Sequence, residues 1–176
     1  MLETQRMILR NLMQEDANDF FEYSKDEEVG KNAGWKPHES LEESRQILND
    51  VFLAEEDVFA MIEKQSGKLI GTVGLISDPT RSNEDARMLG YALGKAYWGK
   101  GFMTEAVKEL LSYGFVKRGY GIISVSYYTE NLRSQRVIEK CGFQFEGLQR
   151  QAERRYDGML MDKKWYTLTK DEFVGI

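Results

Sequence analysis

The chain has 176 residues, of which 41% are hydrophobic and 30% are charged. These values are typical of an ordinary globular protein that is large enough to build a core, so we expect residues 1–176 to form one α/β domain. The 24 basic and 29 acidic residues give a net charge of −5. This balance argues against nucleic-acid binding, which favours a basic excess.

The sequence also predicts the compartment and excludes some kinds of site. Cys141 is the only cysteine and cannot form an internal disulfide, and no run of about 18 apolar residues could cross a membrane. The start, Met1 to Arg6, is polar and unlike a signal peptide. We therefore expect a cytoplasmic protein without membrane contact. With one histidine and one cysteine, we expect no metal site.

The N-terminal part predicts one strand and two helices. Residues 7–12 alternate as a strand does, and residues 14–16 open a helix with acidic side chains in its first turn. Residues 30–37 are expected to form a loop. A second helix is expected in residues 40–51, which begin with a capping-box pattern.

The middle of the chain predicts antiparallel strands. Residues 58–63 and 68–76 read as a hairpin with a turn at 65–67, and a polar loop over 78–85 leads to another strand at 88–93.

The later part changes to a strand-helix-strand pattern. A glycine-bearing connection, 94–101, precedes a helix whose apolar residues recur at helical spacing over 103–111. A strand at 122–128 and a helix at 131–140 follow, and Gly142 is placed to cap that helix.

A final pair of strands is bounded by residues 143–146 and 165–168, with Asp157-Gly158 as their turn. No linker and no repeat interrupts the order β-α-α-β-β-β-α-β-α-β-β. The predicted fold class is α/β (α+β), with a mixed, mostly antiparallel sheet of about seven strands flanked by helices.

The connection between residues 93 and 104 carries the clearest chemical signal. Gly99 and Gly101 allow a sharp turn close to a ligand, and the unpaired N–H groups of the following helix start can bind phosphate. A tight turn that binds nothing is the alternative.

Two familiar phosphate motifs do not fit this loop. A Walker A loop would need Ser or Thr where Gly101 follows Lys100, and a dinucleotide fingerprint would need glycine where Thr104 stands. Residues 119–126 also lack the acid that such a fingerprint pairs with the ribose.

Two segments together resemble the GCN5-related N-acetyltransferases (GNAT), and in particular the branch that acetylates the N-termini of ribosomal proteins. Residues 98–103, Trp-Gly-Lys-Gly-Phe-Met, lie where the family has Gln/Arg-x-x-Gly-x-Gly/Ala, and residues 131–143 match its second cofactor segment. Residues 4–10 resemble its opening strand. Trp98 and Met103 depart from the motif, but the phosphate contacts of the family come mainly from backbone N–H groups.

The resemblance implies acetyl transfer from acetyl-CoA to an amine. The residues that it places around acetyl-CoA are Leu93, Trp98, Gly99, Lys100, Gly101, Phe102, Met103, Thr104, Asn131 and Ser134.

The catalytic residues are also inferred from the resemblance. Many family members have a tyrosine as general acid where this chain has Ile138, whereas the ribosomal-protein branch uses a serine that corresponds to Ser134. That branch has its base in a Gln-Ala-Glu stretch, which makes Glu153 the candidate base. A backbone N–H near Leu93 is expected to stabilise the oxyanion.

Each of these residues has a simpler interpretation. Ser134 could form only a local bond to the backbone, Asn131 could be only a helix N-cap, and Glu153 could form a surface ion pair with the arginines beside it.

The acceptor side is less clearly marked. Loops 30–37 and 78–86 are the candidates for it, and Trp35 is a candidate substrate residue or a core plug. His38 is expected at the surface, and Cys141 in the core.

The expected acceptor is a protein N-terminal α-amine. The alternatives are a small cationic amine, such as a polyamine or an antibiotic, and a non-catalytic module that binds CoA or a nucleotide phosphate. A homodimer is common in the family.

Overall fold

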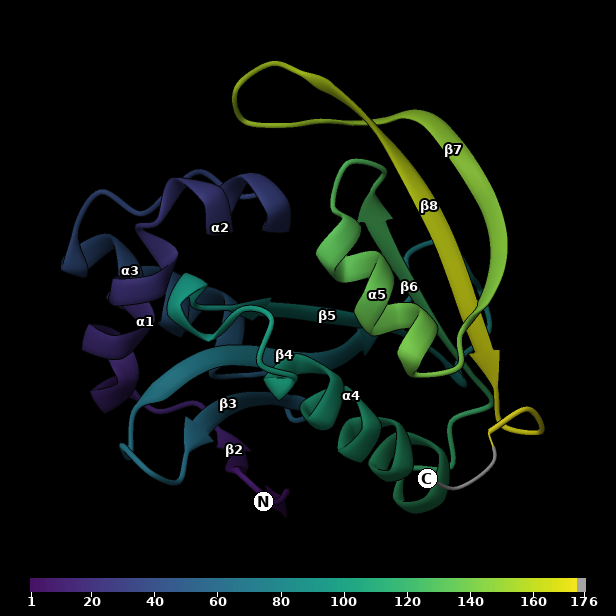
Figure 1. Cartoon of the computed structure of the whole chain (residues 1–176), viewed down its shortest axis with the longest axis horizontal. Helices are drawn as coiled ribbons and strands as arrows, with labels where there is room; N and C mark the ends of the chain where they lie inside the picture. The colour runs from purple at the N-terminus through teal and green to yellow at the C-terminus, as the bar shows by residue number, and fades with distance from the viewer. Residues whose placement is uncertain (174–176) are drawn as a thin grey trace.

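The computed structural model describes residues 1–173 and has one sheet with the strand order β1-β2-β3-β4-β5-β6-β8-β7 (Figure 1). Among the described residues, only β5 and β6 pair in parallel, which confirms the predicted mixed, mostly antiparallel sheet. Residues 1–173 contain eight strands because a two-residue strand precedes the first predicted one. Their bounds are β1 Leu2–Glu3, β2 Met7–Asn11, β3 Val58–Glu63, β4 Leu69–Ser77, β5 Ala86–Leu93, β6 Ile122–Tyr128, β7 Gln144–Arg154 and β8 Leu160–Thr169.

Helices flank the sheet, with α4 and α5 lying in front of it in the view of Figure 1. The helices are α1 Ala17–Ser24, α2 Glu27–Ala33, α3 Leu41–Ile47, α4 Phe102–Ser112 and α5 Leu132–Lys140, and short helical turns cover Gln14–Asp16, Leu48–Phe52, Lys95–Tyr97 and Tyr113–Lys117. Within residues 1–173, no helix is long and apolar enough to cross a membrane.

Alternate residues of the strands pack into two separate hydrophobic cores, one on each face of the sheet. In β3, Phe59 and Met61 pack into the larger core, to which α4 and α5 contribute, whereas Val58 and Ala60 pack into the smaller core with α1 and α2. The sheet therefore separates the α1–α3 side of the molecule from the α4–α5 side.

The prediction of a loop over residues 30–37 is wrong in its first half, because α2 extends to Ala33. Asp26 caps this helix by accepting hydrogen bonds from the N–H groups of Glu28 (2.8 Å) and Val29 (3.2 Å). Gly34 ends it in the left-handed conformation, with φ of 91°.

Of the predictions for the single histidine and the single cysteine, the one for His38 is wrong and the one for Cys141 is confirmed. His38 is buried rather than at the surface: its Nδ1 lies 2.7 Å from the Ser44 hydroxyl and its ring packs on Phe20. Cys141 is buried as expected, and burial raises the pKa of its thiol to about 11.

The β7–β8 hairpin turns at the predicted Asp157-Gly158 and curves over the end of the molecule (Figure 1). Its register changes between the Gln149–Lys163 and Glu153–Met161 pairs, so β7 carries two residues more than β8 in this stretch. Gln151 sits in this bulge with φ of 49°, and its N–H donates to the Asp162 carboxylate at 2.7 Å. Bulges of this kind interrupt the ladder and increase the local twist, here directly before Glu153.

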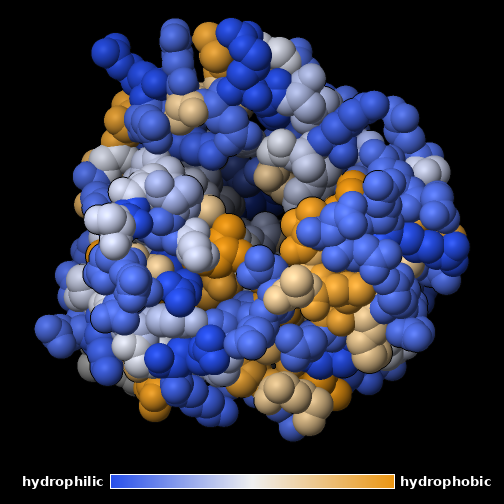
Figure 2. All heavy atoms as spheres, turned by 180° about the vertical axis from the view of Figure 1, so that it is seen from behind, coloured by the Kyte–Doolittle hydropathy of each residue, from blue (hydrophilic) through white to orange (hydrophobic). Residues whose placement is uncertain are grey.

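The parallel pairing of β5 with β6 ends early. It runs from Ala86–Ile122 to Leu89–Val125, whereas β5 continues to Leu93 beside β4 and β6 continues to Tyr128 beside β8. The two strands therefore diverge and leave a wedge between residues 90–93 and 126–128. The face seen from behind is hollowed near its middle, with both hydrophobic and hydrophilic residues around the hollow (Figure 2).

Replacing the N-cap of α2 should destabilise the protein measurably. In Asp26→Ala, the N–H groups of Glu28 and Val29 lose their acceptor, and we expect the free energy of unfolding to fall by about 1 kcal/mol. Urea denaturation followed by circular dichroism measures this change. Glu22→Ala, which removes an exposed carboxylate from α1, is the control and should change little. Equal stability of Asp26→Ala and the unaltered protein would contradict the capping role.

Candidate active site

A cavity lies beside the end of β5, where β5 no longer pairs with β6. It is lined by the end of β5, the glycine loop, the start of α4, one side of α5 and part of α2. Every residue expected around acetyl-CoA lines it except Lys100: Leu93, Trp98, Gly99, Gly101, Phe102, Met103, Thr104, Asn131 and Ser134. The structure thus brings together two sequence segments that are about 30 residues apart. We call this space the first cavity.

The glycine loop has the backbone geometry of an anion site. Gly99 (φ 73°) and Gly101 (φ 83°) adopt the left-handed conformation, and α4 begins directly after them at Phe102. The first N–H groups of a helix have no partner within the helix and lie at the positive end of its dipole. Phosphate oxygens of a ligand in the first cavity could accept hydrogen bonds from them.

Arg6 holds this loop in place from the N-terminal segment. Its guanidinium donates to the Lys100 carbonyl oxygen (2.8 Å) and to the Glu105 carboxylate (2.7 Å), and it lies 4.2 Å from the centre of the Phe102 ring. Lys100 therefore contributes its backbone to the loop, while its side chain does not line the first cavity.

Trp98 links the loop to both β5 and α5. Its indole N–H donates to the Leu93 carbonyl oxygen at 2.7 Å, and the Arg133 guanidinium lies 4.0 Å from the centre of its ring. Arg133, Arg136 and Lys140 all line the first cavity, and none of its described lining residues is acidic. The cavity thus favours an anionic ligand.

The open edge of β5 supplies backbone donors. The Gly94 N–H, directly after β5, donates to the carbonyl oxygen of Ile70 on β4. In an antiparallel ladder, hydrogen-bonded residue pairs alternate with pairs that are not hydrogen-bonded. This alternation turns the N–H groups of Tyr91 and Leu93 away from β4, toward the wedge. The Leu93 carbonyl points the same way, as its bond to Trp98 shows. The expected oxyanion donor near Leu93 is consistent with this geometry.

Asn131 and Ser134 meet at the start of α5. The Asn131 side chain caps the helix by accepting from the Ser134 N–H at 3.1 Å, and both residues line the first cavity. Ser134 is buried, and its hydroxyl lies 2.6 Å from that of Tyr91 on β5. Sequence reasoning missed Tyr91, because nothing in its local pattern distinguishes it from other strand tyrosines.

A second cavity adjoins the first and shares Asn32 and Asn131 with it. It lies between α2 and the turn of the β7–β8 hairpin. Its other lining residues are Glu28, Lys31, Tyr128, Glu130, Arg155, Asp157, Met159 and Met161.

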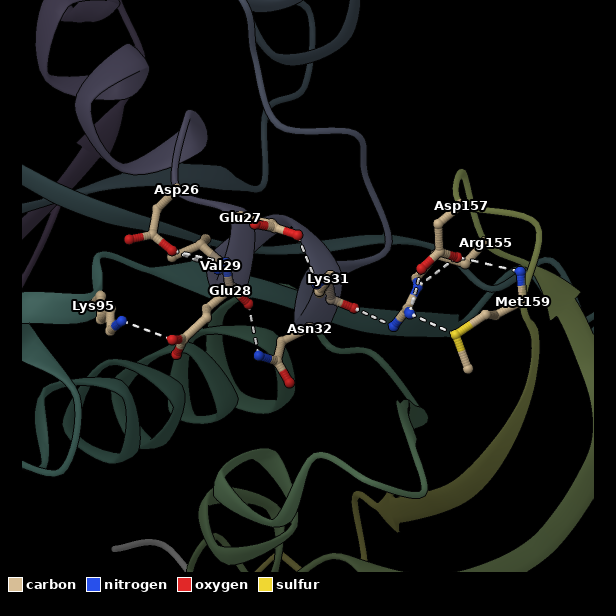
Figure 3. Close-up of polar contacts among 10 residues, drawn as sticks. All are labelled: Asp26, Glu27, Glu28, Val29, Lys31, Asn32, Lys95, Arg155, Asp157 and Met159. Carbon is tan, nitrogen blue, oxygen red and sulfur yellow. Dashed lines mark hydrogen bonds and ion pairs between the residues drawn. The ribbon is translucent and has the colours of Figure 1, made fainter.

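Helix α2 is held from both sides of this second cavity (Figure 3). On one side Glu28 forms an ion pair with Lys95, in the segment that follows β5. On the other, Arg155 from the hairpin turn donates to the Lys31 carbonyl oxygen (3.3 Å) and forms a bidentate pair with Asp157. These contacts hold α2 in place, and α2 carries Asn32, which lines both cavities.

Glu153 lies behind the second cavity rather than in it. Its carboxylate accepts from the Tyr128 hydroxyl at 2.7 Å and forms an ion pair with Lys163, not with Arg154 or Arg155. Partial burial raises the pKa of Glu153, but the hydrogen bonds from Lys163 and Tyr128 and the charge of Lys163 outweigh it, so the pKa lies below its ordinary value.

The two other acceptor-side expectations fall elsewhere in the structure. Trp35 lines neither cavity and packs against the smaller core, as the alternative of a core plug would have it. Loop 78–86 also lines neither cavity, and Asp78 in it is buried, where it accepts from the Ser124 hydroxyl at 2.6 Å. Helix α2 and the β7–β8 hairpin line the second cavity instead.

Comparison with known proteins decides the family. Residues 6–144 match the model of the acetyltransferase (GNAT) domain. The chain belongs to the GCN5-related N-acetyltransferase family. It is 34% identical to the uncharacterized N-acetyltransferase p20 of Bacillus licheniformis, over 99% of this chain and 98% of that protein. It is an acyltransferase of a family that transfers acetyl groups from acetyl-CoA to amines.

Solved structures of the family share the fold. A GCN5-related N-acetyltransferase from Brucella melitensis aligns with a TM-score of 0.84 and 26% identity, over 98% of this chain and 79% of that one. A spermidine N-acetyltransferase from Vibrio cholerae, in complex with CoA and spermine, aligns with a TM-score of 0.80 and 21% identity, over 95% of this chain and 97% of that one. Among curated relatives, the [ribosomal protein uS5]-alanine N-acetyltransferase of Escherichia coli is 29% identical over 61% of this chain and 52% of that protein. The family members thus act on different amines.

A carboxylate in the glycine loop should prevent acetyl-CoA binding. Acetyl-CoA at 100 times its dissociation constant should stabilise the unaltered protein by about 2.7 kcal/mol, and Gly101→Asp should lose this stabilisation because its charge repels phosphate. Thermal-shift titration measures both. Gly67→Asp is the matched control, since Gly67 has a similar φ of 70° in open space on the β3–β4 turn. A full shift in Gly101→Asp would remove the loop from the binding site.

Proposed function

We propose that this enzyme transfers the acetyl group of acetyl-CoA to the α-amine of a protein or peptide N-terminus. The observation that carries the proposal is the opposite charge of two cavities that adjoin at the open end of β5 and β6. Of the described residues that line the first cavity, three are cations and none is acidic, as suits the phosphates of acetyl-CoA. The second cavity has three carboxylates and two cations, which suits a single positive charge.

The second cavity supports an N-terminus over a polyamine. Its net charge of −1 (three carboxylates against two cations) would balance one ammonium group, whereas a polyamine carries several. Met159, Met161 and Tyr128 give it an apolar wall that an uncharged first side chain could contact. The relative that acts on ribosomal protein uS5 and the Gln-Ala-Glu match at residues 151–153 agree with this choice.

The acidity of the acceptor supports the same choice. An α-amine has a pKa near 7.7–8.0, whereas that of an alkyl amine such as the lysine side chain is about 10.4. Glu153, whose pKa is lowered, is a weak base, and it suits an amine that loses its proton easily.

The residues then divide the reaction between them. Bound acetyl-CoA supplies the acetyl thioester. Glu153, acting through the Tyr128 hydroxyl or water, accepts the proton of the ammonium group. The backbone N–H groups of Tyr91 and Leu93 stabilise negative charge on the carbonyl oxygen, and Ser134 hydrogen-bonds the departing sulfur. Asn131 holds the start of α5 and the pantetheine arm.

An acceptor panel tests the choice of amine. We expect kcat/KM for short peptides with a free α-amine and a small first residue to exceed that for spermidine by at least about tenfold, because the cavity balances one charge. The same peptides with a blocked N-terminus and an internal lysine are the control. A higher kcat/KM for spermidine would replace this proposal with small-amine acetylation. Binding of acetyl-CoA without turnover of any amine would favour a non-catalytic module.

The role of Glu153 predicts a pH dependence. In Lys163→Met the main cause of the lowered Glu153 pKa is removed while burial remains, so this pKa should rise. The base is active only above its pKa, and the acidic limb of the kcat–pH profile should therefore move to higher pH. Lys164→Met, which removes the adjacent charge, should leave the profile in place.

Glu153→Gln should lower kcat about 100-fold or more with unchanged acetyl-CoA affinity. An unaltered rate in Glu153→Gln would exclude Glu153 as the base.

A further inference from the structure

Two hydroxyl groups, one from β5 and one from α5, meet in the first cavity, and the family resemblance assigns a role to only one of them. Tyr91 lies on the diverging part of β5, and Ser134 lies in the first turn of α5. Their oxygen atoms are 2.6 Å apart, and both residues line the first cavity. The family position that often holds an acidic tyrosine, residue 138, is a buried isoleucine here. The phenol beside the reaction site therefore comes from the sheet instead of the helix.

The polarity of this hydrogen bond follows from the acidity of the two groups. A phenol, with a pKa near 10, is a stronger acid and a better donor than the alcohol of serine. The other acceptor near the Tyr91 hydroxyl is the Ser134 carbonyl oxygen, at 3.4 Å, which is too long for a strong bond. The 2.6 Å distance between the two oxygens allows either direction; on this argument we assign Tyr91 as the donor and the Ser134 oxygen as the acceptor. The proton of Ser134 remains free to point into the first cavity.

We propose that Tyr91 is a positioning residue that orients and polarises the Ser134 hydroxyl toward the sulfur of acetyl-CoA. This inference rests on the proposed function. As the carbon–nitrogen bond forms and the carbon–sulfur bond breaks, the electron pair of the broken bond stays on sulfur. Ser134 donates a hydrogen bond to that sulfur, and the bond from Tyr91 makes Ser134 a stronger donor. Tyr91 keeps its own proton throughout.

Two features of the surroundings support this arrangement. Burial raises the pKa of Tyr91 above its ordinary value, so the phenol keeps its proton at neutral pH and stays a donor. The Ser134 N–H donates to the Asn131 side chain, and this bond fixes the first turn of α5. The Ser134 hydroxyl can then bond Tyr91 on the sheet and still face the first cavity.

A double-mutant cycle tests whether Tyr91 acts through Ser134. We expect Tyr91→Phe to lower kcat about tenfold, the effect of one lost hydrogen bond in the transition state, with KM and the dissociation constant for acetyl-CoA changed less than threefold. Ser134→Ala should lower kcat at least as much. The double variant should be no slower than Ser134→Ala, because without the serine the phenol has nothing to orient.

The matched control is Tyr23→Phe. Tyr23 is a buried tyrosine whose hydroxyl also meets another hydroxyl, that of Thr72 at 3.2 Å, in the smaller core. Its loss should leave kcat unchanged. Independent, multiplying losses in the double variant, or an unchanged kcat in Tyr91→Phe, would overturn the proposal. A loss in Tyr91→Phe that appears mainly in acetyl-CoA affinity would also overturn it, since that result marks a structural or binding role.

The double-mutant cycle can be measured with whichever amine the enzyme acetylates. If spermidine but not peptides is acetylated by the unaltered protein, the proposed acceptor fails, and the four variants are still compared with spermidine. If no amine is acetylated, the proposed function fails and the proposal for Tyr91 fails with it.

Discussion

The parallel pairing of β5 with β6 is limited to four residue pairs, from Ala86–Ile122 to Leu89–Val125, and the site depends on this limit. Each strand keeps its antiparallel neighbour after the two part, β5 with β4 and β6 with β8. The sheet therefore stays intact on both sides of an opening in its middle. Backbone N–H groups and side chains at that opening are available to a ligand without the loss of a ladder hydrogen bond.

The elements that line the two cavities are arranged around this opening. The glycine loop and α4 follow β5 directly, and α5 follows β6 after a short turn, so both helix starts lie where the strands part. Asn32 of α2 and Asn131 before α5 form the boundary between the two cavities. The anionic donor and the cationic acceptor can therefore approach from different sides, each attracted by charge of the opposite sign.

The parts of the candidate site whose geometry the sequence predicts are those made by neighbours in the chain. The two glycines before α4 and the Asn131 cap of α5 act within a few residues of themselves, so their spacing alone predicts their geometry. The mostly antiparallel sheet follows from strand periodicity and short turns. Helix α2 was missed in part because its Asp26 cap precedes a sequence that includes Gly30, a residue with low helix propensity.

The parts that escaped prediction depend on contacts distant in sequence. Tyr91 gains its partner from a helix 43 residues away, and Glu153 gains Tyr128 from another strand. His38 is buried only because Ser44 and Phe20 surround it in the folded chain. Local patterns carry no information on such pairs, and a family motif located Glu153 without indicating its ion pair with Lys163.

The bulge in β7 also restricts how this chain can change its length. The two additional residues between Gln149 and Glu153 form an even number, so Glu153 faces the same side of the hairpin as Gln149 does. Unless the bulge itself changed, a deletion or insertion of one residue here would turn the side chains from Glu153 to the turn toward the opposite face. Changes of two residues would preserve the alternation. Length variation at this bulge is therefore expected in steps of two, with the carboxylate retained on the same side of the sheet.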